Sequence, residues 1–217
     1  MGRYFNNKSP LKVISNDLKY DSIGTIAFSI RYFFIIIRFI FWSLLKKIHL
    51  ICINVKFGKN NKFIGWSIIS RYPKSQIIIG DNCVFNSAKN VNLIGVNRKC
   101  IISTQSREAI LKIGNNCGFS GTTISAFKKV TIGNNIKFGA NVLITDSDWH
   151  PDDFRSGEDK PVIIEDNVWL GINSVVLKGV RIGKNSLIGA NSVVTKNIPP
   201  NSIAAGNPCV TLKSIIK

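Results

Sequence analysis

The stretch VIIEDNVWLGINSVVLKGVRIGKNSLIGANSVV, residues 162–194, returns to an aliphatic residue at every sixth position. These residues are Ile164, Leu170, Val176, Ile182, Ile188 and Val194. An α-helix repeats about every 3.6 residues and a strand about every 2, so neither explains the period. Short strands joined by tight turns do explain it, because one residue of each strand can then point into the centre of a coil.

The same period extends toward the N-terminus. It includes Ile132, Phe138 and Ile144, then Ile113 and Phe119, and before them Ile79, Phe85 and Val91. Small residues recur four places later, among them Cys83, Cys117, Ser174, Ser186 and Ser192. Asparagines suited to corners with positive φ recur at positions 82, 116, 135, 167, 185 and 191. The pattern predicts a parallel β-helix over residues 53–217, whose stacked coils bury one continuous column. The spacing does not decide the handedness of the coil, although ordinary crossovers favour a right-handed one.

Residues 1–52 form a different segment. Residues 23–52 are strongly apolar, lack the alternation of a strand and are too long for one, which predicts a helix. Arg31 and Arg38 lie seven residues apart and share one face. Two arginines inside the run argue against a simple transmembrane span. Three arrangements remain open: a helix on a membrane surface, a helix packed on the protein or a neighbouring subunit, or a span.

The six-residue period stops once, over about residues 145–160, directly after ITDSDWHP. This stretch contains His150, the only histidine of the repeat region; the other histidine of the chain is His49. Loops that leave a rigid repeat are common positions for functional sites. An imidazole titrates near neutral pH and can accept a proton from an attacking hydroxyl. If the segment is extended, Asp146, Asp148 and His150 point to the same side.

The chain has a formal net charge of +17. Such a charge suits nucleic acid, an anionic membrane or phosphorylated ligands, although a lysine-rich composition alone can produce it. The repeat region has no nucleic-acid-binding motif and no interleaving of aromatic and basic residues, so we predict no nucleic-acid partner. Two distant histidines and five cysteines without zinc-type spacing predict no metal site.

Residues 162–213, and above all the tail GANSVVTKNIPPNSIAAGNPCVTLK, resemble the hexapeptide-repeat acyltransferases. Within that family the likeness is greatest to sugar O-acetyltransferases of the galactoside, maltose and nodulation-factor type. The resemblance implies a left-handed parallel β-helix and acetyl-coenzyme A as the donor. It further implies a homotrimer whose active sites lie between neighbouring subunits.

The resemblance also implies roles for single residues. His150 would be the general base. The alternation of the two aspartates with His150, rather than the resemblance, makes Asp148 the favoured group to orient it. Asp146 is the other candidate for that task, or for binding acceptor hydroxyls, and Ser120 is the second predicted acceptor contact. Gly171 and Ile172 would offer a backbone N–H to the oxyanion. The further predicted donor contacts are Trp169 beside the thioester arm, and Ala190, Thr195, Lys196 and Lys213.

The predicted function is acetylation of a sugar hydroxyl, on a surface polysaccharide or its precursor, by direct transfer from acetyl-coenzyme A. The alternatives are an antibiotic acetyltransferase or an amino-sugar N-acetyltransferase of the same fold, and a purely structural or nucleic-acid-binding repeat protein. We expect a cytoplasmic protein, with residues 23–52 as a peripheral contact to the inner membrane face.

Overall fold

The computed structural model describes residues 19–89 and 91–215, except for the side chains of Arg38 and Phe39. The contacts divide the chain into two compact units, Met1–Phe41 and Trp42–Lys217. Helix α2, Ser22–Cys52, runs through this boundary and confirms the predicted helical segment. Residues 1–18 of the predicted N-terminal segment, and the side chain of Arg38 that we expected beside Arg31, lie outside the described residues.

Helix α2 begins at a side-chain cap. The Asp21 carboxylate accepts a hydrogen bond from the Gly24 N–H at 2.9 Å, which satisfies one donor that the first helical turn leaves unpaired. From there the helix continues for 31 residues without a proline or an acidic residue. Its most apolar stretch is almost entirely exposed, and by length and composition alone the helix could cross a membrane.

The last turns of α2 belong to the second unit and pack on the first coil. The Ser43 hydroxyl accepts the Phe63 N–H at 2.9 Å and donates to the Phe63 carbonyl at 3.2 Å. Leu50 is fully buried in the coil's core. Phe63 lies in the first strand of its sheet, so Ser43 satisfies backbone groups that a sheet edge leaves unpaired.

Lys46 is fully buried beneath this helix end. Its Nζ lies 3.5 Å from the centre of the Trp66 ring and 3.4 Å from His49 Nδ1. Burial, and secondarily the charge of Lys99, lowers the pKa of Lys46 to about 8. The π face of Trp66 therefore stabilises an ammonium group that has no carboxylate partner within the described part of the chain.

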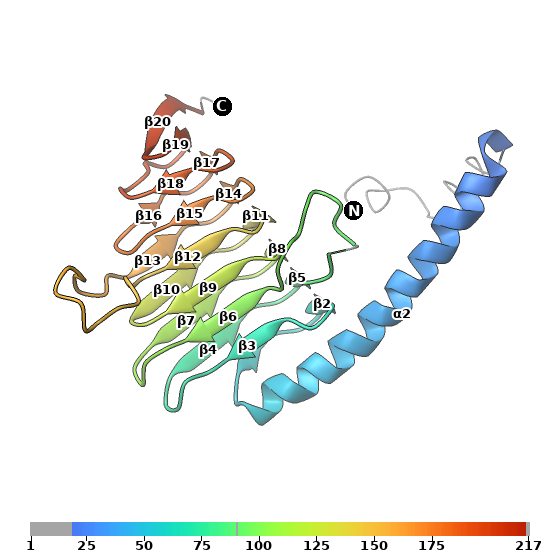
Figure 1. Ribbon diagram of the computed structural model, residues 1–217, viewed down its shortest axis with the longest axis horizontal. Coiled ribbons are helices and arrows are strands. Elements are labelled where there is room, and N and C mark those ends of the chain that lie inside the picture. The colour runs from blue at the N-terminus through green and yellow to red at the C-terminus, as the bar shows by residue number, and fades with distance from the viewer. Residues whose placement is uncertain (1–18, 90, 216–217) are drawn as a thin grey trace. The chain divides into compact units, whose positions relative to one another are not determined.

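The rest of the chain winds into three parallel sheets (Figure 1). Sheet A contains β1 (Lys56–Phe57), β4 (Gln76–Ile79), β7 (Ile110–Ile113), β10 (Lys129–Ile132), β13 (Val162–Ile164) and β16 (Arg181–Ile182). Sheet B contains β2 (Lys62–Ile64), β5 (Val84–Asn86), β8 (Gly118–Ser120), β11 (Lys137–Ala140), β14 (Trp169–Leu170), β17 (Leu187–Ile188), β19 (Ser202–Gly206) and β20 (Cys209–Ser214). Sheet C contains β3 (Ile68–Ser70), β6 (Ile101–Thr104), β9 (Thr123–Ala126), β12 (Leu143–Thr145), β15 (Val175–Val176) and β18 (Val193–Val194).

Each complete turn of the coil adds one strand to sheet A, then one to B, then one to C, with an A–B, a B–C and a C–A corner between them. All strand pairs are parallel except β19 with β20, which closes sheet B by an antiparallel hairpin. The predicted parallel β-helix is confirmed. Its core contains every aliphatic residue of the period in residues 162–194, each no more than 1 % exposed.

Aromatic residues form a column inside the first four coils. Phe63, Phe85, Phe119 and Phe138 stack with ring centroids 5.0, 4.6 and 4.5 Å apart. Each ring occupies the same place in sheet B as the aliphatic residues of the later coils. Cys83 and Cys117 are buried beside them, as their small size predicted.

The A–B corners are held by a ladder of asparagines in the left-handed conformation. The residues Asn60, Asn82, Asn116, Asn135, Asn167, Asn185 and Asn201 all have φ between 55° and 61°. The side-chain amide of each donates to the amide oxygen of the next at 2.8 to 3.3 Å. A shorter ladder at the B–C corners joins Asn141, Asn173 and Asn191 at 3.4 and 3.2 Å. The corner role predicted for asparagine is confirmed.

The prediction of a single break in the coil is wrong. A second excursion, residues 87–100, leaves the B–C corner between β5 and β6. Val91, which fell into the six-residue spacing, lies in this excursion and outside the core. Cys100 is fully buried, and its N–H donates to the Ser87 hydroxyl at 2.9 Å, so the chain re-enters the coil at the point where it left.

Replacing Asn135 with alanine tests the ladder. The change removes two side-chain hydrogen bonds and puts alanine, which tolerates the left-handed region less well than asparagine, at φ 58°, so we expect a loss of about 2 kcal/mol in unfolding free energy. Asn135→Gly keeps the backbone conformation without strain and should lose about 1 kcal/mol. Urea unfolding followed by circular dichroism measures both, and equal losses would show that the left-handed corner does not matter.

Because of Lys46, the free energy of unfolding should change with pH in the alkaline range. Because its folded pKa of about 8 lies below the ordinary lysine value, the folded state releases this proton before the unfolded state does. Stability should therefore rise with pH, by about 2 kcal/mol between about pH 7.5 and about pH 9.5, relative to Lys46→Met. Urea unfolding of both proteins at the two pH values measures the difference. Parallel pH profiles for the two proteins would contradict this expectation.

Candidate active site

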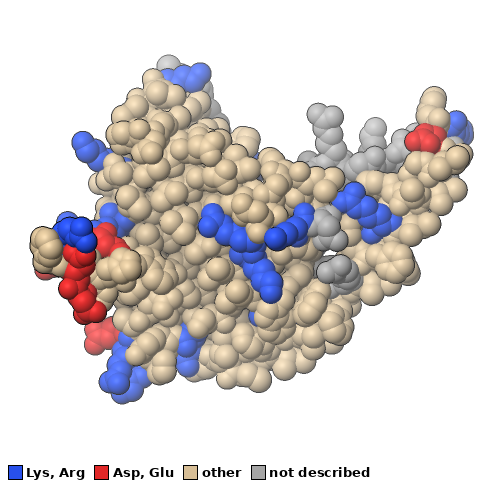
Figure 2. Space-filling view, in the orientation of Figure 1, with Lys and Arg blue, Asp and Glu red and all other residues tan. Residues whose placement is uncertain are grey.

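The excursion that contains His150 covers residues 146–161 and leaves the C–A corner between β12 and β13. It contains six of the twelve acidic residues of the chain. Figure 2 shows the acidic side chains gathered on this projection, while lysines and arginines are spread over the face of the coil. The excursion is therefore a locally negative region on a strongly basic protein.

Asp146 fixes the start of the excursion. Its side chain is fully buried, and its carboxylate accepts the backbone N–H groups of Phe127, Lys128 and Lys129 at 2.7, 2.8 and 2.6 Å. Burial raises the pKa of Asp146, and these three hydrogen bonds act against that rise. We predicted Asp146 to orient His150 or to bind the acceptor. The structure corrects this, because its oxygens are occupied within the corner of the preceding coil.

The segment between Asp146 and His150 is not extended. Trp149 has a φ of 69°, its N–H donates to the Ser147 hydroxyl at 3.1 Å and its indole N–H donates to the Thr145 hydroxyl at 3.0 Å. The rings of Trp149 and Phe127 form a T-shaped pair with centroids 5.1 Å apart. The left-handed turn at Trp149 breaks the alternation on which we based a shared side for the two aspartates and the histidine. That expectation is wrong.

Asp148 bridges the two ends of the excursion. Its carboxylate forms an ion pair with Lys178 and accepts the Gly157 N–H at 3.0 Å. The hydrogen bond from Lys178, followed by that from Gly157, lowers the pKa of Asp148. His150 is not among the partners of this carboxylate in the described structure. Sequence reasoning missed Lys178, which lies in the next coil and carries no motif of its own.

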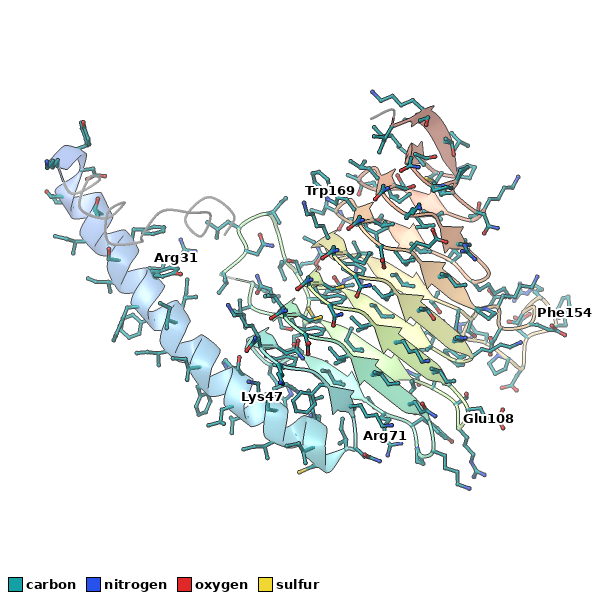
Figure 3. All side chains as sticks on the ribbon, turned by 180° about the vertical axis from the view of Figure 1, so that it is seen from behind. Arg31, Lys47, Arg71, Glu108, Phe154 and Trp169 are labelled. Carbon is teal, nitrogen blue, oxygen red and sulfur yellow. The ribbon has the colours of Figure 1, made fainter. Side chains whose placement is uncertain are left out.

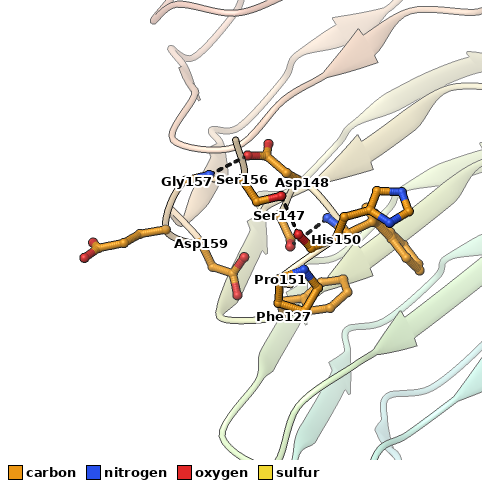
Figure 4. A pocket seen from close by; sticks show the side chains of 10 residues that line it. Phe127, Ser147, Asp148, His150, Pro151, Ser156, Gly157 and Asp159 are labelled. Atoms are coloured by element: carbon orange, nitrogen blue, oxygen red, sulfur yellow. Dashed lines mark hydrogen bonds between the residues drawn. The ribbon is translucent and has the colours of Figure 1, made fainter. Parts of the chain in front are cut away.

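His150 is exposed and is one of the residues that line a cavity of about 280 Å³ (Figure 4). Its backbone carbonyl accepts the Asp153 N–H at 3.1 Å and the Ser156 hydroxyl. The cavity is lined by Phe127, Ser147, Asp148, Trp149, His150, Pro151, Ser156, Gly157, Glu158 and Asp159. The main chain of His150 is thus held in place, while the imidazole remains available for proton transfer.

The other predicted residues divide between two corners of the coil. Thr195 and Lys196 follow β18 at the C–A corner, the corner of His150. Gly171, Ile172, Ala190 and Ser120 lie at or beside the B–C corner. Trp169, which is 51 % exposed, and Lys213 lie in sheet B. Within one chain, the strands of sheet C separate His150 from the predicted oxyanion contact, so the structure does not bring these two groups together.

The B–C corner offers two unused backbone donors. In the described chain the N–H groups of Ile172 and Ala190 have no acceptor. The coils approach closely here, since a Cβ on Gly139 would lie 2.5 Å from the Ile172 nitrogen and one on Gly171 2.5 Å from that of Ala190. Glycine is therefore required, and the two N–H groups form a short row that could bind a carbonyl oxygen or an oxyanion.

Ser120 is covered by the second excursion. Its hydroxyl accepts the Asn92 side-chain amide at 3.0 Å, and Asn141 next to it binds the Gly95 carbonyl and the Asn97 N–H at 2.9 and 3.1 Å. Sequence reasoning missed Asn92 and Asn141. The six-residue spacing does place Asn141 at a corner, but it does not reveal that a remote loop folds onto it.

Part of the chain is similar to known proteins. A profile described as the hexapeptide repeat of succinyl-transferase matches residues 161–196. Galactoside O-acetyltransferase of Lactococcus lactis is 50 % identical over 91 residues, which are 40 % of this chain and 44 % of that protein. Galactoside O-acetyltransferase of Escherichia coli is 41 % identical over 111 residues, 48 % of this chain and 54 % of that protein. The chain thus matches about half the length of these curated relatives.

Among solved structures, an N-acyltransferase from Bacillus cereus, in complex with dTDP-4-amino-4,6-dideoxyglucose and coenzyme A, has a TM-score of 0.58. The match covers 79 % of this chain and 89 % of that chain at 16 % sequence identity. At this identity the likeness concerns the fold alone. Together with the repeat profile and the three parallel sheets, it supports the left-handed β-helix.

Asp146→Ala tests the structural role of the buried carboxylate. The change leaves three N–H groups without an acceptor, so we expect a loss of about 3 kcal/mol in unfolding free energy. Hydrogen exchange should rise at the amides of Phe127, Lys128 and Lys129. Asp146→Asn, which keeps an acceptor oxygen, should lose about half as much. A variant that loses activity at unchanged stability and exchange would show that Asp146 acts in the chemistry instead.

Proposed function

Since its repeat coil is that of the hexapeptide-repeat acetyltransferase family, we propose that this protein transfers an acetyl group from acetyl-coenzyme A to a hydroxyl of a sugar. The observation that carries the proposal is the position of His150. It is the only histidine of the coil, and it is exposed at a cavity on an excursion that Asp146 and Asp148 hold in place. A scaffold protein has no need to interrupt its core for such a loop.

The chemistry asked of this histidine is proton transfer. The neutral imidazole accepts the proton of the acceptor hydroxyl while the hydroxyl oxygen attacks the thioester carbonyl. The resulting tetrahedral intermediate carries a negative oxygen, for which the N–H groups of Ile172 and Ala190 are suitable donors. When the carbon–sulfur bond breaks, the imidazolium returns its proton to the leaving sulfur. Ester and free thiol are the products, and the histidine is neutral again.

Asp148 acts in this proposal as a positioning residue. Its bonds to Lys178 and Gly157 hold the excursion closed behind His150, without contact to the imidazole. This revises the predicted orienting role from direct to indirect. The imidazole of His150 can then be oriented by a group of a neighbouring subunit that hydrogen-bonds to the ring nitrogen not used for proton transfer.

We propose that the complete site forms between two copies in a homotrimer. The placement of His150 at a C–A corner and of the Ile172 and Ala190 donors at B–C corners supports this, because one copy alone keeps them apart. The acidic excursion would repel the phosphates of coenzyme A. The basic residues Lys196 and Lys213, both exposed and both outside the excursion, suit those phosphates better. Trp169 and Thr195 complete the proposed donor contacts.

The test is acetyl transfer by the purified full chain, with release of the coenzyme A thiol as the readout. A panel of sugars, amino sugars and aminoglycoside antibiotics serves as acceptors. We expect turnover with sugar hydroxyls. Preferred turnover with amines would move the acceptor to the N-acetyltransferase alternative. Absence of turnover with every acceptor would overturn the enzymatic function.

His150→Ala should lower kcat by about a thousandfold, because the hydroxyl loses its proton acceptor. Coenzyme A binding by calorimetry should stay within about twofold, since His150 is not itself among the proposed donor contacts. His49→Gln is the matched control, because it removes the other histidine from a position in α2, and it should keep its activity. Full activity of His150→Ala would show that the mechanism is wrong.

A further inference from the structure

Helix α2 carries an apolar stripe, and Lys47, near one edge, is the one basic residue in that half of the helix. At about 100° per residue, thirteen large apolar side chains fall within one half of the helix surface over a length of about 42 Å. Each is more than one third exposed. The stripe consists of Ile23, Ile26, Ile30, Phe33, Phe34, Ile36, Ile37, Ile40, Phe41, Leu44, Leu45, Ile48 and Ile51. Figure 3 shows side chains projecting along the whole of the helix.

The side of α2 that packs on the first coil carries both polar and apolar residues, among them the buried Leu50. Within the second unit, Ser43, Lys46 and His49 face the first coil through Phe63 and Trp66. The stripe residues of the same turns, among them Leu44 and Ile48, remain exposed at 61 % and 52 %. The coil therefore occupies one side of this helix end and leaves the apolar side open.

The charges of the helix determine which partner fits the stripe. Residues 22–52 contain no acidic residue and four lysines and arginines, within a chain of net charge +17. Two copies that met through their stripes would bring like charges together. A bilayer with anionic lipid offers an apolar interior for the stripe and negative headgroups for Arg31 and Lys47, whereas Lys46 is buried against the coil. We propose that α2 lies on an anionic membrane surface with this stripe in the acyl region.

Lying on the surface fits the helix better than spanning the bilayer. The longest run of α2 without a charged residue is Ser22–Ile30. A helix that spans a bilayer needs about 20 apolar residues, which is more than this run supplies. Ser43, Lys46 and Leu50 are buried against the coil, so lipid cannot surround the last turns of the helix. A helix whose last turns are covered by protein on one side and expose apolar residues on the other suits the plane of an interface.

Vesicle sedimentation of the full chain tests the inference without reference to enzymatic activity. We expect binding to vesicles of equimolar phosphatidylcholine and phosphatidylglycerol, and at least tenfold weaker binding to phosphatidylcholine alone. Salt should weaken the binding to the anionic vesicles. An alkaline carbonate wash should release the protein. Failure to bind anionic vesicles would overturn the inference, and resistance to the wash would overturn the surface arrangement in favour of a span.

Paired variants separate the stripe from general stickiness. Phe34→Asn/Ile37→Asn removes two stripe residues and should weaken binding to the anionic vesicles at least tenfold. Leu93→Asn/Ile94→Asn removes two apolar residues of the 87–100 excursion that are even more exposed, and it should leave binding unchanged. Unaltered thermal unfolding of the coil shows that both variants are folded. Equal binding by both variants would overturn the role of the stripe. A smaller oligomer for the stripe variant in the absence of vesicles would assign the stripe to self-association instead.

Discussion

The close approach of successive corners is the constraint on which this molecule depends. At the A–B corners a left-handed asparagine turns the chain, and its amide also binds the amide of the next coil. At the B–C corners glycines leave no room for a side chain between coils. With corners fixed in this way, the strands of each sheet stay in register, and the residues at every sixth position meet in one column. The core is thus a consequence of the corners as much as their cause.

The rigid coil also positions the candidate site, through two aspartates of the excursion. The buried carboxylate of Asp146 ties the start of the excursion to the backbone of the preceding coil, and Asp148 ties its far end to Lys178 of the next one. Two coils that cannot shift relative to each other therefore hold the main chain around His150. A loop with this support loses little entropy when an acceptor arrives, which favours an oriented proton transfer.

The sequence was sufficient for the fold because the period is a property of every coil. It predicted the buried residues, the asparagine corners and the excursion around His150. It did not predict the excursion at 87–100, because an insertion can carry a residue such as Val91 in register by coincidence. Nor did it predict the roles of the aspartates, since their direction depends on one left-handed residue, Trp149. The six-residue spacing predicts only the regular coils, whereas the contacts of the candidate site lie in an excursion that departs from this spacing.

Stacked parallel strands with aligned asparagines and aromatic rings are also the architecture of amyloid fibrils, which grow by adding strands at an open edge. Sheet B, the longest sheet here, is closed at both ends. Ser43 of α2 satisfies backbone groups of its first strand, and the antiparallel strand β20 covers its last parallel one. The end turns of α2 therefore have a consequence besides their packing: by occupying the edge, they keep a fibril-like coil from recruiting the next molecule as a further strand.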